Sequence, residues 1–327
     1  MKLSIVTTLY QSGPTICEFY RRAIEASAAI TDDVELVFVN DGSSDNSLEL
    51  AIALCDSDPR IKIIDLSRNF GHHKALMTGL CYARGDLVFL IDSDLQEDPE
   101  ALGRLYERLS KGDCDVVYGY QPKRQGSLFE RITGGLYFSL VDMLSDGKIP
   151  RNLLTLRLMT NEYVRALIRY RDREFVISQL WAISGYRQIG LPVQKRPART
   201  RSYSLSRRIE YVVKHVTTTS TKLLYAVFYG GLGLFSIAGG IIVFFLCRYL
   251  FFGVRVSGFT SIIISIWLFG GLTILILGII AIYIANILSE TKRRPYTVVR
   301  RVYRAHDKAK LPAGDTAQAP STGRATG

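Results

Sequence analysis

The chain has 327 residues and a formal net charge of +11, with 41 Lys and Arg against 30 Asp and Glu. This length allows one sizeable α/β domain and an additional segment, because single cores stop growing at roughly 250 to 300 residues. The five cysteines are widely spaced without a C-x-x-C pair, which excludes a small disulfide scaffold and indicates buried thiols in a reducing compartment. The positive charge suits nucleic acid, anionic lipid or phosphorylated substrates, so its distribution has to decide among them.

Short β-branched runs alternate with stretches of helix length through the first two hundred residues. The runs read LSIVTTL, VELVFVND, IKIIDLS, DLVFLIDSD and CDVVYGY. Apolar strands joined by crossover helices predict a mostly parallel sheet with helices on both faces, whose ligands bind beyond the C-terminal strand ends. The N-terminal stretch MKLSIVTTLYQSG is too short and too polar for a signal peptide, so we expect residues 1–204 to form a cytosolic domain.

Two of these runs end in acidic side chains. Asp92, Asp94 and Gln96 follow one run, and in an extended segment residues i and i+2 face the same side. The three would then present hard oxygen ligands to Mg²⁺ or Mn²⁺ bridged to a diphosphate, although a turn that caps the next helix is the alternative. Asp41 follows another run, where it either accepts hydrogen bonds from a base or ribose or forms a turn and N-cap.

Two uncharged runs follow, at residues 223–247 and 256–289, and each exceeds the ~20 apolar residues that a bilayer-spanning helix needs. The alternative is a pair of buried core helices, which normally keep a polar face. Lys and Arg gather outside the pair, and only Arg248 and Arg255 lie between the runs. By the positive-inside rule we expect a transmembrane hairpin at 223–290 with both ends in the cytoplasm.

The segments that flank the hairpin are basic. Residues 205–222 place apolar side chains at helical spacing among cations, which predicts an amphipathic helix on the membrane surface or, alternatively, a helix packed on the preceding domain. Residues 291–327 are first basic and, after Arg304, poor in large apolar side chains. We therefore expect a basic and then disordered cytosolic tail.

Five sequence strings together resemble glycosyltransferase family 2, in the branch that contains dolichyl-phosphate mannose synthase and bacterial polyprenyl-phosphate glycosyltransferases. They are SIVTTLY, VFVNDGSSDNS, RNFGHHKALMTGL, ARGDLVFLIDSDLQEDPE and SETKRRPYTVV, and the resemblance covers about residues 3–300. It implies a GT-A fold, a divalent cation (Mg²⁺ or Mn²⁺), and inverting transfer of a sugar from a nucleotide-sugar to an undecaprenyl- or dolichyl-type phosphate. It also implies an integral protein of a bacterial inner membrane, with its catalytic domain in the cytoplasm.

The resemblance assigns roles to single residues at the strand ends. Tyr10, Asp41 and Asp92 match positions that hold the nucleotide-sugar, while Asp92, Asp94 and Gln96 match those that hold the metal and diphosphate. Asp94 is accordingly a catalytic candidate. Neither the nucleotide nor the sugar follows from these residues.

Further catalytic and lipid-phosphate candidates are arginines. Arg157 lies in the string TLRL where the family commonly has DFRL, and Thr155 replaces an Asp that would serve as a base. A lipid phosphate is already anionic near neutral pH, so this change favours a phosphate acceptor over a sugar hydroxyl. By resemblance, Arg196 contacts the donor diphosphate and Arg124 and Arg131 face the lipid phosphate, which a guanidinium binds well. The alternative for these three is a basic side chain against solvent or headgroups.

Other functions stay open from the sequence alone. A processive polysaccharide synthase would carry Gln-x-x-Arg-Trp, of which only Gln179 and Trp181 are present. A family 2 transferase with another glycan or lipid acceptor, and a degenerate membrane scaffold, are the remaining alternatives. Nucleic acid is not an expected partner, because the cations gather at the membrane flanks. Membrane lipids are expected partners, and glycines in the spans would also permit a homo-oligomer.

Overall fold

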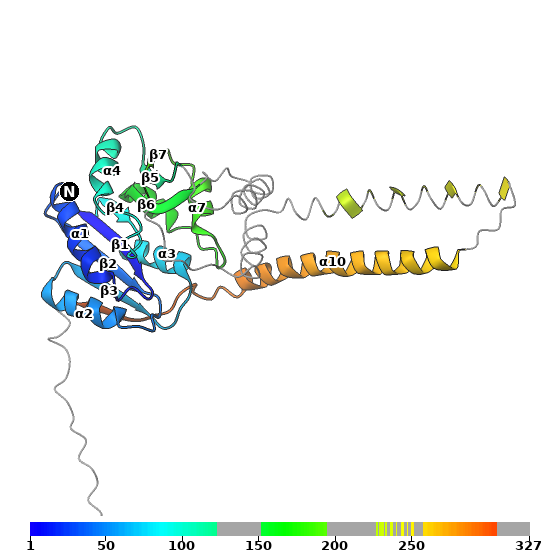
Figure 1. Cartoon of the computed structure of the whole chain (residues 1–327), viewed down its shortest axis with the longest axis horizontal. Helices are drawn as coiled ribbons and strands as arrows, with labels where there is room; N and C mark the ends of the chain where they lie inside the picture. The colour runs from blue at the N-terminus through cyan, green and yellow to red at the C-terminus, as the bar shows by residue number, and fades with distance from the viewer. Residues whose placement is uncertain are drawn as a thin grey trace, which may run out of the picture.

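The computed structural model describes residues 1–122, 152–194 and 258–305, together with isolated helical positions between 227 and 251. Figure 1 shows an α/β domain from which one long helix, α10, runs outward. The predicted amphipathic helix at 205–222 lies outside the described residues.

One sheet forms the centre of the domain. Its eight described strands lie in the order β7-β5-β6-β4-β1-β2-β3-β8. The strands are β1 (Leu3–Leu9), β2 (Val34–Asn40), β3 (Ile61–Leu66), β4 (Leu87–Leu90), β5 (Val116–Tyr120), β6 (Leu153–Thr160), β7 (Gln188–Pro192) and β8 (Val299–Arg304). Four neighbouring pairs are parallel and three are antiparallel, so the sheet is mixed where we expected mostly parallel strands.

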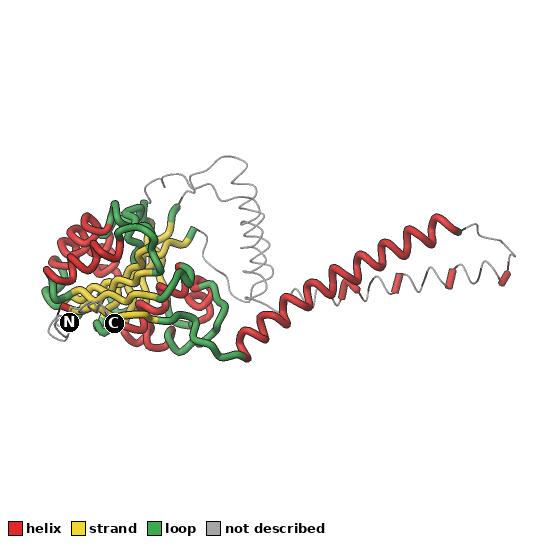
Figure 2. Tube along the Cα trace, turned by 90° about the horizontal axis from the view of Figure 1, so that it is seen from below, coloured by secondary structure: helices red, strands yellow, loops and turns green. Residues whose placement is uncertain are grey.

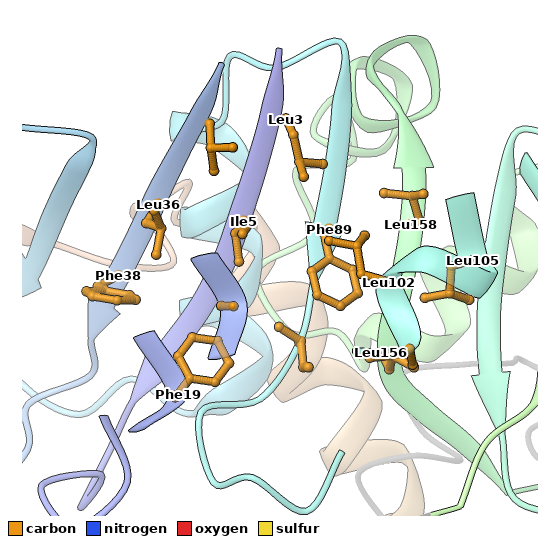
Figure 3. Packing of buried hydrophobic residues seen from close by; sticks show 14 of the residues in the cluster. Leu3, Ile5, Phe19, Leu36, Phe38, Phe89, Leu102, Leu105, Leu156 and Leu158 are labelled. Carbon is orange, nitrogen blue, oxygen red and sulfur yellow. The ribbon is translucent and has the colours of Figure 1, made fainter. Parts of the chain in front are cut away.

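Helices cover both faces of the sheet, as Figure 2 shows. One face packs against α1 (Ile16–Ala28), α2 (Ser47–Ser57) and α4 (Ala101–Leu109); the other packs against α3 (His72–Tyr82), α6 (Asn161–Leu167) and α7 (Ile177–Ile183). In β1, Leu3 and Ile5 face the first layer, in the same cluster as Phe19 of α1 (Figure 3). Val6 belongs to the cluster on the other face, with residues of α3. This alternation follows from the two-residue period of a strand.

α3 lies very close to the sheet. A Cβ atom added at Gly79 would stand 2.5 Å from Cγ1 of Val6 and 3.0 Å from Cγ2 of Val39. Ordinary carbon contacts need about 3.5 to 4.0 Å, so only glycine fits at this position without a shift of the helix. The N-terminus of α3 is thereby held at the C-terminal edge of β1 and β2.

The long helix α10 (Phe259–Thr291) contains 33 residues, which corresponds to about 50 Å of length. Among the described residues, it holds the one segment long and apolar enough to cross a membrane, Phe269–Thr291. This segment overlaps the second predicted span. The first predicted span, 223–247, falls mostly outside the described residues, so the two-span prediction stays a prediction.

After α10 the chain returns to the domain. Residues 299–304 form β8, which pairs antiparallel with β3 at the edge of the sheet. Residues 299–304 of the basic segment are therefore part of the sheet, and the expectation that the α/β domain ends at residue 204 was wrong. The mixture of three arginines with Val and Tyr in β8 resembles a charged membrane flank in sequence, although charged side chains are also common on edge strands. Residues from 306 onward lie outside the described residues.

Candidate active site

Three predicted site residues meet at one edge of the sheet. β4, β1 and β2 are parallel neighbours, so their C-terminal ends lie side by side. Asp92 follows β4, Tyr10 follows β1 and Asp41 follows β2 directly. This is the edge at which open α/β sheets bind ligands.

The acidic loop after β4 is a turn. β4 ends at Leu90, and Leu95 has a positive φ of 58°, so the extended backbone that we expected from Asp92 to Gln96 is absent. The backbone N–H of Gln96 donates to Oδ1 of Asp94 at 3.0 Å. Ser93 holds the loop against β1, because its hydroxyl donates to the carbonyl oxygen of Thr8 at 2.8 Å. The side chains of this loop are therefore placed by a turn and its anchors, not by strand alternation.

Asp92 and Asp94 form an oxygen-rich donor set that fits a hard divalent cation. Oδ1 of Asp92 is buried and has no hydrogen-bond partner, while Nε2 of His72 lies 3.4 Å from it. Asp94 is exposed. Within the described residues no three His, Cys, Asp or Glu side chains enclose a metal by themselves. Such a set suits Mg²⁺, which is commonly bound by one or two carboxylates together with substrate phosphates.

Asp41 holds the loop that precedes α3. Its two carboxylate oxygens accept hydrogen bonds from the backbone N–H of Phe70 at 2.7 Å and of Gly71 at 3.1 Å. Burial raises the pKa of Asp41, although these two hydrogen bonds oppose that shift. The carboxylate therefore already has structural partners, and a contact with a nucleotide would come in addition to them.

Tyr10 presents its ring to solvent. The residue is 47% exposed, and the next residue, Gln11, has a positive φ of 55°. The backbone N–H of Gln11 donates to Oγ of Ser43 at 2.6 Å, which fixes the turn after β1 to the loop after β2. An exposed aromatic ring on a fixed turn is well placed to stack against a flat base.

Arg157 in β6 lies in the interior. Its side chain is fully buried, and its guanidinium carbon lies 3.0 Å from the centroid of the Trp181 ring. Burial lowers the pKa of Arg157 to about 9, and Nη1 forms no hydrogen bond. The structure thus buries this catalytic candidate in β6, where it pairs with Leu90, the last residue of β4 before the acidic loop. Its catalytic role stays a prediction.

Two side chains that the sequence did not single out shape the acidic loop. Glu97 is fully buried and accepts hydrogen bonds from the backbone N–H of Leu156 at 2.9 Å and of Thr155 at 3.3 Å, which ties the loop to β6. Arg22 of α1 donates to Glu100 and to Asp98, the latter at 2.8 Å. The sequence around Pro99 did not predict these hydrogen bonds, because the β6 backbone and Arg22 lie far from the acidic loop in the sequence.

Three predicted arginines lie outside the described residues: Arg124, Arg131 and Arg196. The structure therefore places Tyr10, Asp41 and Asp92 after the C-terminal ends of β1, β2 and β4, with Asp94 and Gln96 in the turn that follows β4. The roles of all these residues, and the arginine contacts to donor and acceptor, stay predictions.

A known protein family matches the part of the chain that forms this edge. The model of glycosyl transferase family 2 matches residues 4–172, which include the three strand ends and the acidic loop. The chain belongs to glycosyl transferase family 2. It is therefore a glycosyltransferase, and the mixed α/β sheet agrees with the GT-A fold of the family.

Relatives of this family 2 enzyme align over nearly the whole chain. A glycosyltransferase-named protein of Mycobacterium tuberculosis is 45% identical over 303 residues, covering 93% of this chain and 89% of the relative. The uncharacterized glycosyltransferase YkcC of Bacillus subtilis is 34% identical over 94% of this chain and 96% of its own length. The bactoprenol glucosyl transferase of Shigella phage SfII is 29% identical over 94% of this chain and 100% of its own length. The predicted resemblance to the polyprenyl-phosphate branch is confirmed.

The solved structures that resemble this chain cover about two thirds of it. The mannosyltransferase PcManGT of Pyrobaculum calidifontis, solved with GDP-Man and Mn²⁺, aligns with 65% of this chain and 62% of its own, at 20% identity and a TM-score of 0.47. Similarity at this level adds nothing to the function.

Proposed function

We propose that this enzyme transfers a sugar from a nucleotide-sugar to a polyprenyl phosphate at the cytoplasmic face of a bacterial inner membrane. The observation that carries the proposal is the alignment of bactoprenol glucosyl transferases along 94% of the chain, a match that extends well beyond the family domain. The apolar segment Phe269–Thr291 supports membrane attachment. Two spans, with the catalytic domain and the C-terminus in the cytoplasm, remain part of this proposal.

The donor would lie along the edge formed by β4, β1 and β2. Tyr10 stacks on the base, Asp41 keeps the loop at Phe70 closed beside it, and Asp92, Asp94 and Gln96 hold Mg²⁺ or Mn²⁺ against the diphosphate. The cation, when bound, neutralises charge on the diphosphate. His72, 3.4 Å from Asp92, restricts the orientation of that carboxylate.

Transfer would proceed by direct displacement. A phosphate oxygen of the acceptor attacks the anomeric carbon, a new carbon–oxygen bond forms, and the bond to the diphosphate breaks with release of the nucleoside diphosphate. Attack from the opposite face inverts the configuration. The anionic phosphate needs no base, consistent with Thr155 where the family commonly has Asp. Arg196 would bind the diphosphate, and Arg124 and Arg131 would bind the acceptor phosphate. Arg157 stays a catalytic candidate beside the acidic loop, together with Asp94 and Arg196.

The test is transfer from a panel of labelled nucleotide-sugars to a short-chain polyprenyl phosphate with Mg²⁺ or Mn²⁺. We expect a labelled lipid that is lost with EDTA and in Asp94→Ala. Asp32→Ala, which removes an exposed carboxylate ahead of β2, serves as the matched control and should keep full transfer. A folded protein that binds nucleotide-sugar yet forms no lipid product would refute the acceptor and favour a different glycan acceptor. A protein that also fails to bind nucleotide-sugar would be a scaffold.

A further inference from the structure

A basic hollow of about 300 Å³ lies where α10 meets the catalytic domain. Its cations come from three separate parts of the chain: Arg68 and Lys74 near the start of α3, Arg173 ahead of α7, and Lys292 and Arg294 just after α10. The junction itself is well fixed, because the carboxylate of Glu290 accepts a hydrogen bond from the backbone N–H of Arg173 at 2.6 Å. The cations are therefore held together by the fold.

Five cations line this hollow against one carboxylate, and the carboxylate of Glu290 lies next to it at the backbone of Arg173. One carboxylate lines it, Glu174, and that group already pairs with Lys74 at 2.8 Å. Within the described part of the chain, Arg173, Lys292 and Arg294 form no ion pair with a carboxylate. Three cations that converge on one hollow repel each other unless an anion enters it.

Along α10 and the residues after it, the lining of the hollow changes from apolar to positively charged. Ala285 and Leu288 line it from the apolar segment, and Lys292 and Arg294 follow within the next six residues. A phospholipid matches this arrangement, because its acyl chains would lie beside the apolar residues and its phosphate beside the cations. A free phosphate ion would use the cations alone. The carboxylates Asp92 and Asp94 do not line the hollow, so it is separate from the predicted metal position.

We propose that this hollow binds the phosphate of an anionic phospholipid headgroup. The inference rests on the proposed membrane attachment of the enzyme. It also connects the membrane surface to the donor site, because Arg68 and Phe70 line the hollow and the backbone N–H of Phe70 donates to Asp41. A bound headgroup would therefore hold the same loop that Asp41 holds from the other side.

The test measures lipid binding to the full chain in detergent by native mass spectrometry, with phosphatidylglycerol and phosphatidylcholine as probes. We expect wild type to retain phosphatidylglycerol in preference to phosphatidylcholine. Arg173→Gln with Arg294→Gln should weaken this binding about tenfold or more, at roughly fivefold for each cation near a membrane surface. Arg173→Lys with Arg294→Lys should retain most of it. The matched control, Lys111→Gln with Arg187→Gln, removes two exposed cations beside α4 and β7 and should bind as wild type does.

Three results would overturn the proposal. These are equal retention of both lipids by wild type, unchanged binding in the doubly neutralised variant, and displacement of phosphatidylglycerol by equimolar polyprenyl phosphate or by millimolar inorganic phosphate. The last result would make the hollow an acceptor site or a free-anion site. Because the readout is binding, an enzyme that retains phosphatidylglycerol but forms no sugar-lipid would refute the proposed function alone.

Discussion

Gly79 of α3 tests how closely this helix must pack for the fold and the site. Gly79→Ala adds one methyl group that would stand 2.5 Å from Val6, about 1 Å inside ordinary contact. Overpacking of this kind costs roughly 1 to 3 kcal/mol, while the change from Gly to Ala within a helix returns about 1 kcal/mol. We therefore expect a net destabilisation of up to about 2 kcal/mol. A shift of α3 would also move His72 away from Asp92 and weaken nucleotide-sugar binding.

The matched control is the same substitution at Gly103 of α4, where an added Cβ meets no atom within 4 Å. Gly103→Ala should be neutral or stabilise the chain by up to about 1 kcal/mol. The two variants would then differ by up to about 3 kcal/mol, which corresponds to about 6 to 12 °C in the melting temperature of a domain of this size. Thermal unfolding of the purified full chain measures the difference. Equal melting temperatures for the two variants would refute the close packing of α3 on the sheet.

Three further substitutions address buried carboxylates and their partners. Burial alone would raise the pKa of Glu35, but hydrogen bonds and nearby lysines hold it below its ordinary value of 4.5, so its stabilisation is present above that pH and is lost as pH falls. Glu35→Gln should thus cost about 1 to 3 kcal/mol at pH 7. In thermal unfolding the gap to wild type should shrink as the pH falls through the lowered pKa of Glu35, and a gap that stays constant with pH would contradict this. Glu97→Gln leaves one acceptor oxygen for two backbone N–H groups of β6, so the free energy of unfolding should fall by about 1 to 3 kcal/mol. Unchanged stability would show that other contacts hold the loop. Arg22→Met keeps the apolar stem but frees Glu100 into solvent, so the expected loss is about 1 to 2 kcal/mol and should shrink at high salt.

Several strands of the domain could be predicted from local sequence patterns. The apolar runs at 3–9, 34–39 and 61–66 became β1, β2 and β3, because an unbroken β-branched run bounded by polar residues fits a buried parallel strand. β6 and β8 gave no such signal. β6 carries Arg157 at its centre, where the guanidinium lies against the Trp181 ring of a distant helix. β8 contains three arginines in six residues and lies at the edge of the sheet. Pairing across such sequence separations is a tertiary effect that local pattern does not contain.

Some features of the candidate site could also be predicted from the sequence, and others could not. The placement of Asp41 and Asp92 at one edge of the sheet was predictable, because parallel strands end at the same edge. The turn at Asp92 to Gln96 was not predictable from alternation, since it depends on Ser93 and Glu97 reaching other strands. The contact of His72 with Asp92 was equally hidden, because the packing of α3 on β1 and β2 sets it.

The pairing of β8 with β3 has a consequence for how the enzyme is made. The strand that completes this edge of the sheet is synthesised after α10, so translation delivers this long apolar helix before the sheet is complete. Until then β3 exposes a row of unpaired backbone groups, which is a template for aggregation. A chain shortened ahead of α10 to make it water-soluble would keep that open edge permanently. If residues 299–304 are attached again through a flexible linker, they should restore the pairing of β3 with β8 in a chain that lacks α10.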